Sequence, residues 1–412
     1  MVPDGPVVPA GRSAKGVVMT GASTRPTVLV LGGGFAGVRA AIDLAEQGRF
    51  DVTLVSDRDY LYLYPISIWI PVRSISPERT RVPLAPIAAR HGFRTTICPV
   101  TSIDTAARTV GCGDRSLGYD YLVIALGSGK TALPGIEHTI SLCGPPQAAL
   151  DLRDRIDALL ARGGGSVAFG FGGNPKDGSA VRGGPVFELL FNVDHLLRRA
   201  GVRDAVDLTF FAPMPRPGDR MGPKAADRMV EMLAGKDVAR RIGTPLRGFD
   251  AAGVVFSDDT RLDADLVVFV PGAGGHPLLV GSDLPLNEAG FVRIDDHGLV
   301  EGQSTVYAVG DCAALEGPPW RAKQGHVAEV MARTAAYNIG QQDRGLPDRR
   351  GYQKHVSIIC VMDTGDGAAV VYRDARRDLM VPLPVVGHWL KQGWGWYARA
   401  TATTRMPRIP GM

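Results

Sequence analysis

Continuous apolar runs, rather than alternating apolar and polar positions, mark the clearest predicted strands of this chain. One run, Thr27–Gly32, enters a glycine-rich turn and is followed by helical spacing over Val38–Ala45. Further strand-like runs cover Asp51–Ser56, Tyr119–Gly127 and Thr305–Gly310. Strands with two apolar faces belong to parallel sheets that helices cover on both sides. The pattern therefore predicts an α/β protein with Rossmann-like folds.

The first strand, turn and helix contain a G-x-G-x-x-G pattern. Gly32 permits the tight turn, Gly34 lets the backbone approach a pyrophosphate, and Gly37 lets helix and strand pack closely. Phe35 and Ala36 complete the turn, and the helix N-terminus faces the anion. The pattern predicts a dinucleotide site, and a glycine-rich turn without a ligand is the alternative.

Three further segments favour FAD as the dinucleotide. At the end of the second strand, Asp57 is the predicted ribose ligand, with Ser56 as the alternative. The small-residue turn Ala125–Gly127 and the strand end Gly310–Asp311 are typical of the segments that return to the flavin in two-domain flavoproteins. The carboxylate of Asp311 is expected to bind the ribityl chain of FAD.

A helix predicted over residues 327–339 follows these segments, and its N-terminus is expected to face the flavin. Lys323 and Gln324 precede that helix. Together with the helix dipole they are expected to stabilise the negative charge of the reduced flavin. A solvated surface lysine is the alternative for Lys323.

A second dinucleotide fold is predicted in the middle of the chain, without a working NADH site. Its first strand, Gly164–Gly170, is followed by an insert, Asn174–Gly184, that is longer than a G-x-G-x-x-G turn. The next strand, Val206–Phe211, ends without an acidic residue for a ribose. This degeneracy predicts an electron donor other than NADH.

Composition narrows the class of protein. The chain has 412 residues, and at about 100–200 residues per domain this allows two or three domains. A hydrophobic content of 45% is that of a globular protein, and a net charge of +4 does not favour nucleic-acid binding. No apolar run reaches the roughly 18–20 residues that span a bilayer, and no metal site is predicted. Residues 1–26 are expected to be a disordered extension without a secretory signal.

Five cysteines in a chain of this length do not indicate a disulfide-stapled secreted protein. Any disulfide is therefore expected to be catalytic. Cys98 and Cys112 lie in β-rich segments and are expected to be structural residues. Cys312 follows the last flavin-binding strand, so a third redox sulfur is an alternative to a structural role.

The chain resembles sulfide:quinone oxidoreductases, which are related to type II NADH dehydrogenases and flavocytochrome c sulfide dehydrogenases. The resemblance covers nearly the whole chain after residue 26. It depends on five segments, which are Gly32–Gly37, Val52–Ser56, Asp59–Trp69, Ser141–Cys143 and Cys360–Ala368. The two segments that contain cysteine are the most specific.

The resemblance implies that Cys143 and Cys360 form the redox pair beside the flavin. A sulfur nucleophile would open their disulfide, and the released thiolate would pass electrons to FAD. Glu188 is the candidate proton carrier, with a helix-capping charge as its alternative. Two inert buried thiols are the alternative for the cysteine pair. The histidine that often follows the first cysteine in the family is absent from Gly144–Gln147.

The C-terminal region is predicted to form an interfacial helix on a membrane. At about 100° per residue, five apolar side chains fall on one arc of roughly 160°. These side chains are Trp389, Leu390, Trp394, Trp396 and Tyr397. The polar side chains outside the arc are Lys391, Gln392 and Arg399, and Arg405 and Arg408 add positive charge. Such a helix suits an anionic lipid surface, where a quinone is met. A helix packed on its own domain or on a dimer partner is the alternative.

These features predict a three-part chain. The FAD domain is split between residues 27–140 and 265–345, and the degenerate fold covers residues 145–262. The region 346–412 contains Cys360 and the membrane contact.

We expect a flavoprotein with non-covalent FAD, peripheral on the cytoplasmic membrane, that oxidises sulfide or a related sulfur nucleophile and reduces quinone. A homo-oligomer is an open alternative to a monomer. The alternatives are a type II NADH:quinone oxidoreductase, a sulfide dehydrogenase subunit that reduces a cytochrome, and a redox-gated binding module.

Overall fold

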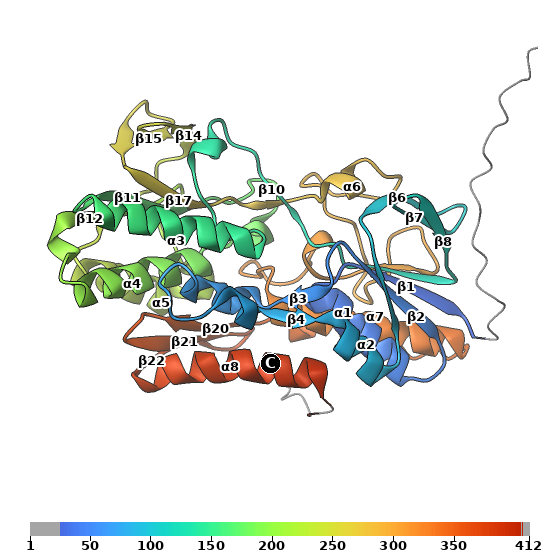
Figure 1. Ribbon diagram of the computed structural model, residues 1–412. Coiled ribbons are helices and arrows are strands. Elements are labelled where there is room, and N and C mark those ends of the chain that lie inside the picture. Colours follow the sequence, from blue (N-terminus) through green and yellow to red (C-terminus); the bar gives the residue numbers. More distant parts are fainter. Residues whose placement is uncertain (1–24, 405, 407–412) are drawn as a thin grey trace, which may run out of the picture.

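A computed structural model describes residues 25–404 and residue 406. The extension predicted for residues 1–26 lies outside the described residues except for its last two, and Arg405 and Arg408 also lie outside them. Two parallel sheets flanked by helices confirm the predicted α/β fold with two Rossmann-like units (Figure 1). Among the described residues, no helix is long and apolar enough to cross a bilayer.

The first parallel sheet brings together segments that are far apart in the sequence. Its strand order is β19-β9-β1-β2-β5, with Val30 of β1 opposite Val123 of β9 and Leu54 of β2. Helices α1 and α7 pack against each other beside it. The strands are β1 (Thr27–Leu31), β2 (Asp51–Ser56), β5 (Arg94–Ile97), β9 (Tyr121–Ile124) and β19 (Val306–Ala308). The helices are α1 (Phe35–Glu46), α2 (Leu84–His91) and α7 (Gly325–Asp343).

The second parallel sheet is built from the middle of the chain. Its order is β13-β12-β11-β17, and its aromatic core includes Phe187 stacked on Phe210 with ring centres 4.8 Å apart. The strands are β11 (Gly165–Phe171), β12 (Val206–Ala212), β13 (Ala239–Ile242) and β17 (Leu266–Val270). The helices are α3 (Pro146–Ala161), α4 (Gly184–Arg199) and α5 (Pro223–Gly235).

A three-stranded antiparallel sheet carries the C-terminal helix. Its strands are β20 (Ile358–Asp363), β21 (Gly367–Arg373) and β22 (Asp378–Pro384), and α8 (Val386–Thr403) runs along one face of it (Figure 1). A Cβ atom at Gly387 would lie 2.6 Å from the Cβ of Ala368, so glycine allows this helix to lie close against the sheet. Strand β20 also contacts α4, so Cys360 faces the second Rossmann-like unit.

Short antiparallel strands complete the fold. They are β3 (Tyr60–Tyr62) with β4 (Arg81–Pro83), β6 (Val100–Asp104) with β7 (Thr109–Cys112) and β8 (Arg115–Gly118), β10 (Gly129–Lys130) with β18 (Ala273–Gly274), and β14 (Leu246–Asp250) with β15 (Gly253–Phe256) and β16 (Arg261–Asp263). The four-residue helix α6 (Pro277–Val280) follows β18.

The disulfide of this structure joins the two cysteines that were expected to be structural, and not the candidate redox pair. Cys98, just after β5, is bonded to Cys112 at the end of β7, with their Cα atoms 5.7 Å apart. Neither residue lines the large cavity between the two Rossmann-like units and the C-terminal region. The bond links the β6–β8 sheet to the edge strand of the first parallel sheet, which favours a structural role.

Candidate functional site

A cavity of about 1510 Å³ lies where the two Rossmann-like units and the C-terminal region meet. Its walls include the β1–α1 turn, the turn after β9, the end of β19, the first turn of α7, the start of α4, strand β20 and helix α8. A pocket for one small ligand is typically about 300–1,000 Å³. The cavity is therefore large enough for a dinucleotide cofactor together with a substrate.

The glycine-rich turn fits a bound pyrophosphate. Gly32 has a φ of +111°, and a Cβ atom there would lie 2.3 Å from the carbonyl oxygen of Ala125. A Cβ atom at Gly37 would lie 1.8 Å from the carbonyl oxygen of Gly32, so only glycine permits this strand–helix packing. At Gly34 it would meet no atom within 4 Å, which leaves open space in front of the uncapped N-terminus of α1. Gly34, Phe35 and Ala36 line the cavity.

The two candidate ribose ligands lie at the end of β2 but do not line the cavity. Ser56 is buried beneath the turn, where a Cβ atom at Gly33 would lie 2.4 Å from its hydroxyl oxygen. Asp57 has 71% of its side chain exposed. Arg58, which the sequence analysis did not single out, does line the cavity. The ribose contact of Asp57 or Ser56 stays a prediction.

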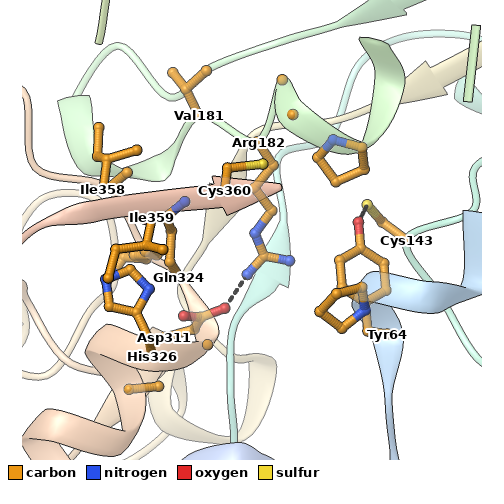
Figure 2. A pocket seen from close by; sticks show the side chains of 18 of the residues that line it. Tyr64, Cys143, Val181, Arg182, Asp311, Gln324, His326, Ile358, Ile359 and Cys360 are labelled. Atoms are coloured by element: carbon orange, nitrogen blue, oxygen red, sulfur yellow. Dashed lines mark hydrogen bonds and ion pairs between the residues drawn. The ribbon is translucent and has the colours of Figure 1, made fainter. Parts of the chain in front are cut away.

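The two segments expected to return to the flavin, Ala125–Gly127 and Gly310–Asp311, both line the cavity. An arginine that the sequence analysis did not single out connects them. Arg182 forms an ion pair with Asp311 (Figure 2). It also donates to the Ser128 hydroxyl over 2.8 Å. This arginine belongs to the insert Asn174–Gly184, whose unusual length was its only signal in the sequence.

Lys323 is buried, so the alternative of a solvated surface lysine is wrong. Its ammonium nitrogen lies 3.8 Å from the centre of the Phe291 ring and donates to the carbonyl oxygen of Ala313. Burial lowers the pKa of Lys323 to about 8, although the negative charge of Asp311 acts to raise it. Lys323 and Gln324 both line the cavity at the N-terminus of α7.

The two candidate redox cysteines line the same cavity although they are far apart in the sequence. Cys143 precedes α3, and its sulfur lies 2.7 Å from the Tyr64 hydroxyl (Figure 2). Cys360 lies on β20, and its sulfur lies 3.7 Å from a carboxylate oxygen of Glu188. Both are free thiols in this structure. The fold therefore supplies two separate thiols to one cavity.

The two thiols have different electrostatic surroundings. Burial raises the pKa of Cys143, but Arg182 and the Tyr64 hydroxyl lower it again. Burial and, to a smaller extent, the carboxylate of Glu188 together raise the pKa of Cys360 to about 12. A thiolate is therefore better stabilised at Cys143 than at Cys360.

Glu188 forms a buried ion pair with Lys391 of α8. Each side chain is only 5% exposed, and both line the cavity. Burial raises the pKa of Glu188 to about 7, although Lys391 opposes the shift. The alternative of a helix-capping charge does not apply, because Glu188 lies one turn inside α4 and is paired with another element.

The predicted apolar arc of the C-terminal helix is not a single exposed face. Trp389 and Trp396 are 66% and 63% exposed, whereas Trp394 and Tyr397 line the cavity. Lys391, predicted on the polar side, is buried against the protein. The helix is turned in this way because Gly387 packs on Ala368 of β21 and Gly395 packs on Ile66, which a helical wheel cannot reveal.

Cys312 does not share the cavity with the other thiols. It is fully buried, and its sulfur lies 3.3 Å from the carbonyl oxygens of Ile124 and Val309. Burial raises its pKa to about 11. These contacts favour the structural alternative for Cys312 over a third redox sulfur.

Comparisons with other proteins place the chain among flavoproteins. Residues 26–336 match the family model described as pyridine nucleotide-disulphide oxidoreductase. The sulfide-quinone reductase of Aquifex aeolicus is 26% identical over an alignment of 397 residues, and the match covers 90% of this chain and 89% of that protein. A type II NADH:quinone oxidoreductase of Staphylococcus saprophyticus is 26% identical over an alignment of 375 residues, and the match covers 85% of this chain and 91% of that protein. The structure of the A. aeolicus sulfide:quinone oxidoreductase has the same fold, with a TM-score of 0.83 at 24% identity over 93% of each chain.

Proposed function

We propose, since the chain belongs to the pyridine nucleotide-disulphide oxidoreductase family, that it is an FAD-dependent enzyme that oxidises sulfide and reduces quinone. The observation that carries the proposal is the presence of Cys143 and Cys360 in one cavity with the dinucleotide-binding turns. The similarity to the A. aeolicus sulfide-quinone reductase over 90% of this chain supports the choice of substrates.

FAD would be held without a covalent bond, by the turn at Gly34–Ala36, the segment Ala125–Ser128, and Asp311. Bound FAD supplies a two-electron acceptor beside the cysteines. Lys323, with the N-terminus of α7, places positive charge on the wall of the cavity. This charge would favour the anionic reduced form of the cofactor.

Sulfur chemistry would begin with the two cysteines joined as a disulfide. Attack by hydrosulfide on the sulfur of Cys360 forms a persulfide there and releases Cys143 as a thiolate, so that atoms and charge balance. The thiolate is assigned to Cys143 because Arg182 and the Tyr64 hydroxyl stabilise negative charge at this sulfur. Glu188, 3.7 Å from Cys360, would accept the proton of the persulfide.

Quinone would reach the cavity from a membrane surface at the C-terminal region. Large apolar side chains are exposed on β22, at the start of α8 and along it, which is typical of an interfacial surface. They are Leu379, Val381, Val385, Val386, Trp389, Leu390 and Trp396. On the inner side of the same helix, Trp394 and Tyr397 line the cavity. The helix would therefore separate the lipid from the cofactor, and Glu188 with Lys391 would deliver protons to the quinone.

A type II NADH:quinone oxidoreductase is the second candidate, and the similarity to such an enzyme of S. saprophyticus favours it. Against this candidate, the connection from β11 to α4 is longer than the glycine-rich turn of a dinucleotide site. It runs through the turn Gly178–Ala180, and Arg182 from this connection lines the cavity. Strand β12 ends at Ala212, followed by Pro213, without a carboxylate for a ribose.

The experiment is anaerobic addition of sulfide, and separately of NADH, to the purified holoprotein, with the visible flavin absorption followed in time. We expect rapid bleaching by sulfide that is lost in Cys143→Ser and Cys360→Ser and is kept in the control Cys312→Ser. Bleaching by NADH alone, unaffected by the cysteine variants, would establish the second candidate instead.

A further inference from the structure

Asp363 of β20 and His388 of α8 form a contact that does not line the cavity. The Nδ1 atom of His388 lies 2.7 Å from one carboxylate oxygen of Asp363. The other carboxylate oxygen accepts hydrogen bonds from Trp69 Nε1 and from the main-chain N–H of Gly365. The Asp363 side chain is fully buried, whereas 23% of the His388 side chain is exposed. One imidazole therefore joins a fixed interior carboxylate to the surface.

The hydrogen bonds of His388 fix which ring nitrogen carries the proton. An ionised carboxylate only accepts, so Nδ1 donates to Asp363. Nε2 lies 2.9 Å from the amide nitrogen of Gln392, which only donates, so Nε2 accepts. The neutral ring can therefore take a proton at Nε2 and give one from Nδ1 to Asp363. An imidazole held in this way can pass a proton from one side to the other.

His388 lies on a different flank of α8 from the residues that line the cavity. At about 100° per residue, Trp394 and Tyr397 lie roughly 120° and 180° from His388 around the helix axis. Both of these aromatic residues line the cavity, and His388 does not. Lys391 lies about 60° from both His388 and Trp394. The buried pair of Lys391 and Glu188 is therefore placed between the cavity and the flank that carries His388.

Asp363 and Glu188 are neighbouring acids in the interior. Asn192, one turn after Glu188 on α4, donates its amide to the main-chain oxygen of Glu188 over 2.8 Å and to that of Asp363 over 3.4 Å. Burial raises the pKa of Glu188, and the negative charge of Asp363 also acts to raise it. The contact between His388 and Asp363 therefore leads to the surroundings of the candidate proton carrier.

Quinone reduction needs a proton supply that does not pass through the occupied cavity. Reduction of one quinone to a quinol takes two electrons and two protons. The anionic reduced flavin carries two electrons and one of these protons, so Glu188 would supply the other. Glu188 is buried and lines the cavity, so a quinone bound there would cover it. Its proton must then be replaced from the side away from the quinone.

We propose that His388 and Asp363 form a proton-entry site that resupplies Glu188 from the outer flank of α8. The inference rests on the proposed function, since quinone reduction is the step that consumes the proton. His388 takes a proton from solvent at Nε2 and gives one from Nδ1 to Asp363. One bridging water carries it from Asp363 to Glu188. Each turnover passes one proton along this path, and no electron moves.

The test is the reoxidation of the reduced holoprotein by quinone, which involves no sulfide. The protein is reduced with an equivalent of dithionite, mixed anaerobically with a short-chain ubiquinone at neutral pH, and followed by the return of the visible flavin absorption. His388→Ala should slow this return by about tenfold or more. Imidazole added to the buffer should restore most of the rate, because the missing ring leaves room beside Trp69, whose ring centre lies 5.3 Å from that of His388.

Two further variants separate proton transfer from packing. His388→Gln keeps a hydrogen bond to Asp363 but carries no proton, so it should be as slow as His388→Ala. Asp363→Asn should also be slow, and imidazole should not restore it, because the next group of the path is missing. The matched control is His355→Ala, at an exposed position outside the cavity, which should be reoxidised like the wild type with or without imidazole.

Three results would overturn the proposal. The first is a wild-type rate of reoxidation in His388→Ala with FAD content equal to the wild type. The second is a slow rate in His388→Ala that imidazole does not restore, which would make His388 a packing residue. The third is a wild-type rate in His388→Gln, which would show that only the hydrogen bond matters. If Asp363→Asn does not fold, the His388 variants and imidazole decide the question.

The outcome is separable from the proposed function. If quinone reoxidises the wild type and the His388 variants equally fast, only the proton entry is wrong. If quinone does not reoxidise the wild-type flavin, quinone reduction is wrong and the proton entry with it. If the variants behave as expected but sulfide does not bleach the flavin, the proton entry stands and the sulfide oxidation is wrong.

Discussion

Glu188 on α4 and Lys391 on α8 form a buried ion pair that joins the middle of the chain to its C-terminal helix. The two residues are 203 positions apart in the sequence, so only the tertiary fold brings them together. The pair closes the cavity beside Cys360 and couples the candidate proton carrier to the candidate membrane helix.

Removing one member of this pair is expected to destabilise the protein. Lys391→Met would leave the carboxylate of Glu188 buried without a counter-charge, at a cost of about 3 kcal/mol in the free energy of unfolding. The double variant Glu188→Gln with Lys391→Met should recover most of that loss, since no charge is then buried. Denaturant unfolding above pH 7, where Glu188 is ionised, measures both. If Lys391→Met is as stable as the wild type, the pair of Glu188 and Lys391 is open to water.

The pH dependence of quinone reduction should reflect Glu188. Burial raises the pKa of Glu188 to about 7, so its carboxyl group carries a proton below that pH and loses it above. A group that delivers protons to quinone must be protonated, so turnover should fall as the pH rises through about 7. Glu188→Gln should lower turnover by about 100-fold and remove this limb of the profile. If the fall in turnover near pH 7 persists in Glu188→Gln, another group causes it.

The hydroxyl of Tyr64 is expected to tune the Cys143 thiol. Because the two atoms lie 2.7 Å apart and this contact lowers the pKa of Cys143, Tyr64→Phe should raise that pKa. Alkylation of Cys143 by iodoacetamide, followed by peptide mass mapping across a pH series, should then reach half of its maximal rate at a higher pH. Tyr372→Phe, on β21 outside the cavity, should leave the midpoint unchanged.

Membrane binding should depend on the exposed tryptophans of α8. Trp389 and Trp396 are 66% and 63% exposed, and their burial in the lipid interface would contribute apolar area. Replacing both by serine should weaken binding to vesicles of phosphatidylglycerol and phosphatidylcholine by about tenfold or more. Val280→Ser, at a 58% exposed position on α6, is the control. If the double variant binds vesicles as well as the wild type does, the membrane contact lies elsewhere on the protein.

The Cys98–Cys112 disulfide is expected to stabilise the fold without affecting the flavin chemistry. It closes a loop with a sequence separation of 14, for which the chain-entropy effect is about 3 kcal/mol. Cys98→Ala should lower the free energy of unfolding by about that amount in oxidising buffer. Sulfide-driven bleaching at a temperature where the variant stays folded should match the wild type. Loss of bleaching would assign the bond a redox role after all.

Much of the fold was predictable because its signals are local. The apolar runs of β1, β2 and β11 identify buried strands, and the spacing of Gly32, Gly34 and Gly37 identifies the first turn. The candidate cysteines could be selected because each lies in a distinctive short segment. Arg182 could not, because the length of its insert says nothing about the direction in which its side chain points.

The sequence by itself determined the α/β class, the dinucleotide-binding turn and the presence of two candidate redox thiols, since these depend on periodicity and on glycine geometry within about a dozen residues. Only the tertiary structure decided which cysteines are bonded, that Arg182 reaches Asp311, and that Lys391 turns inward to Glu188. These contacts join distant segments, and they depend on how sheets and helices pack rather than on any local pattern. The orientation of α8 follows the same rule, because the packing of Gly387 and Gly395 overrides its apolar arc.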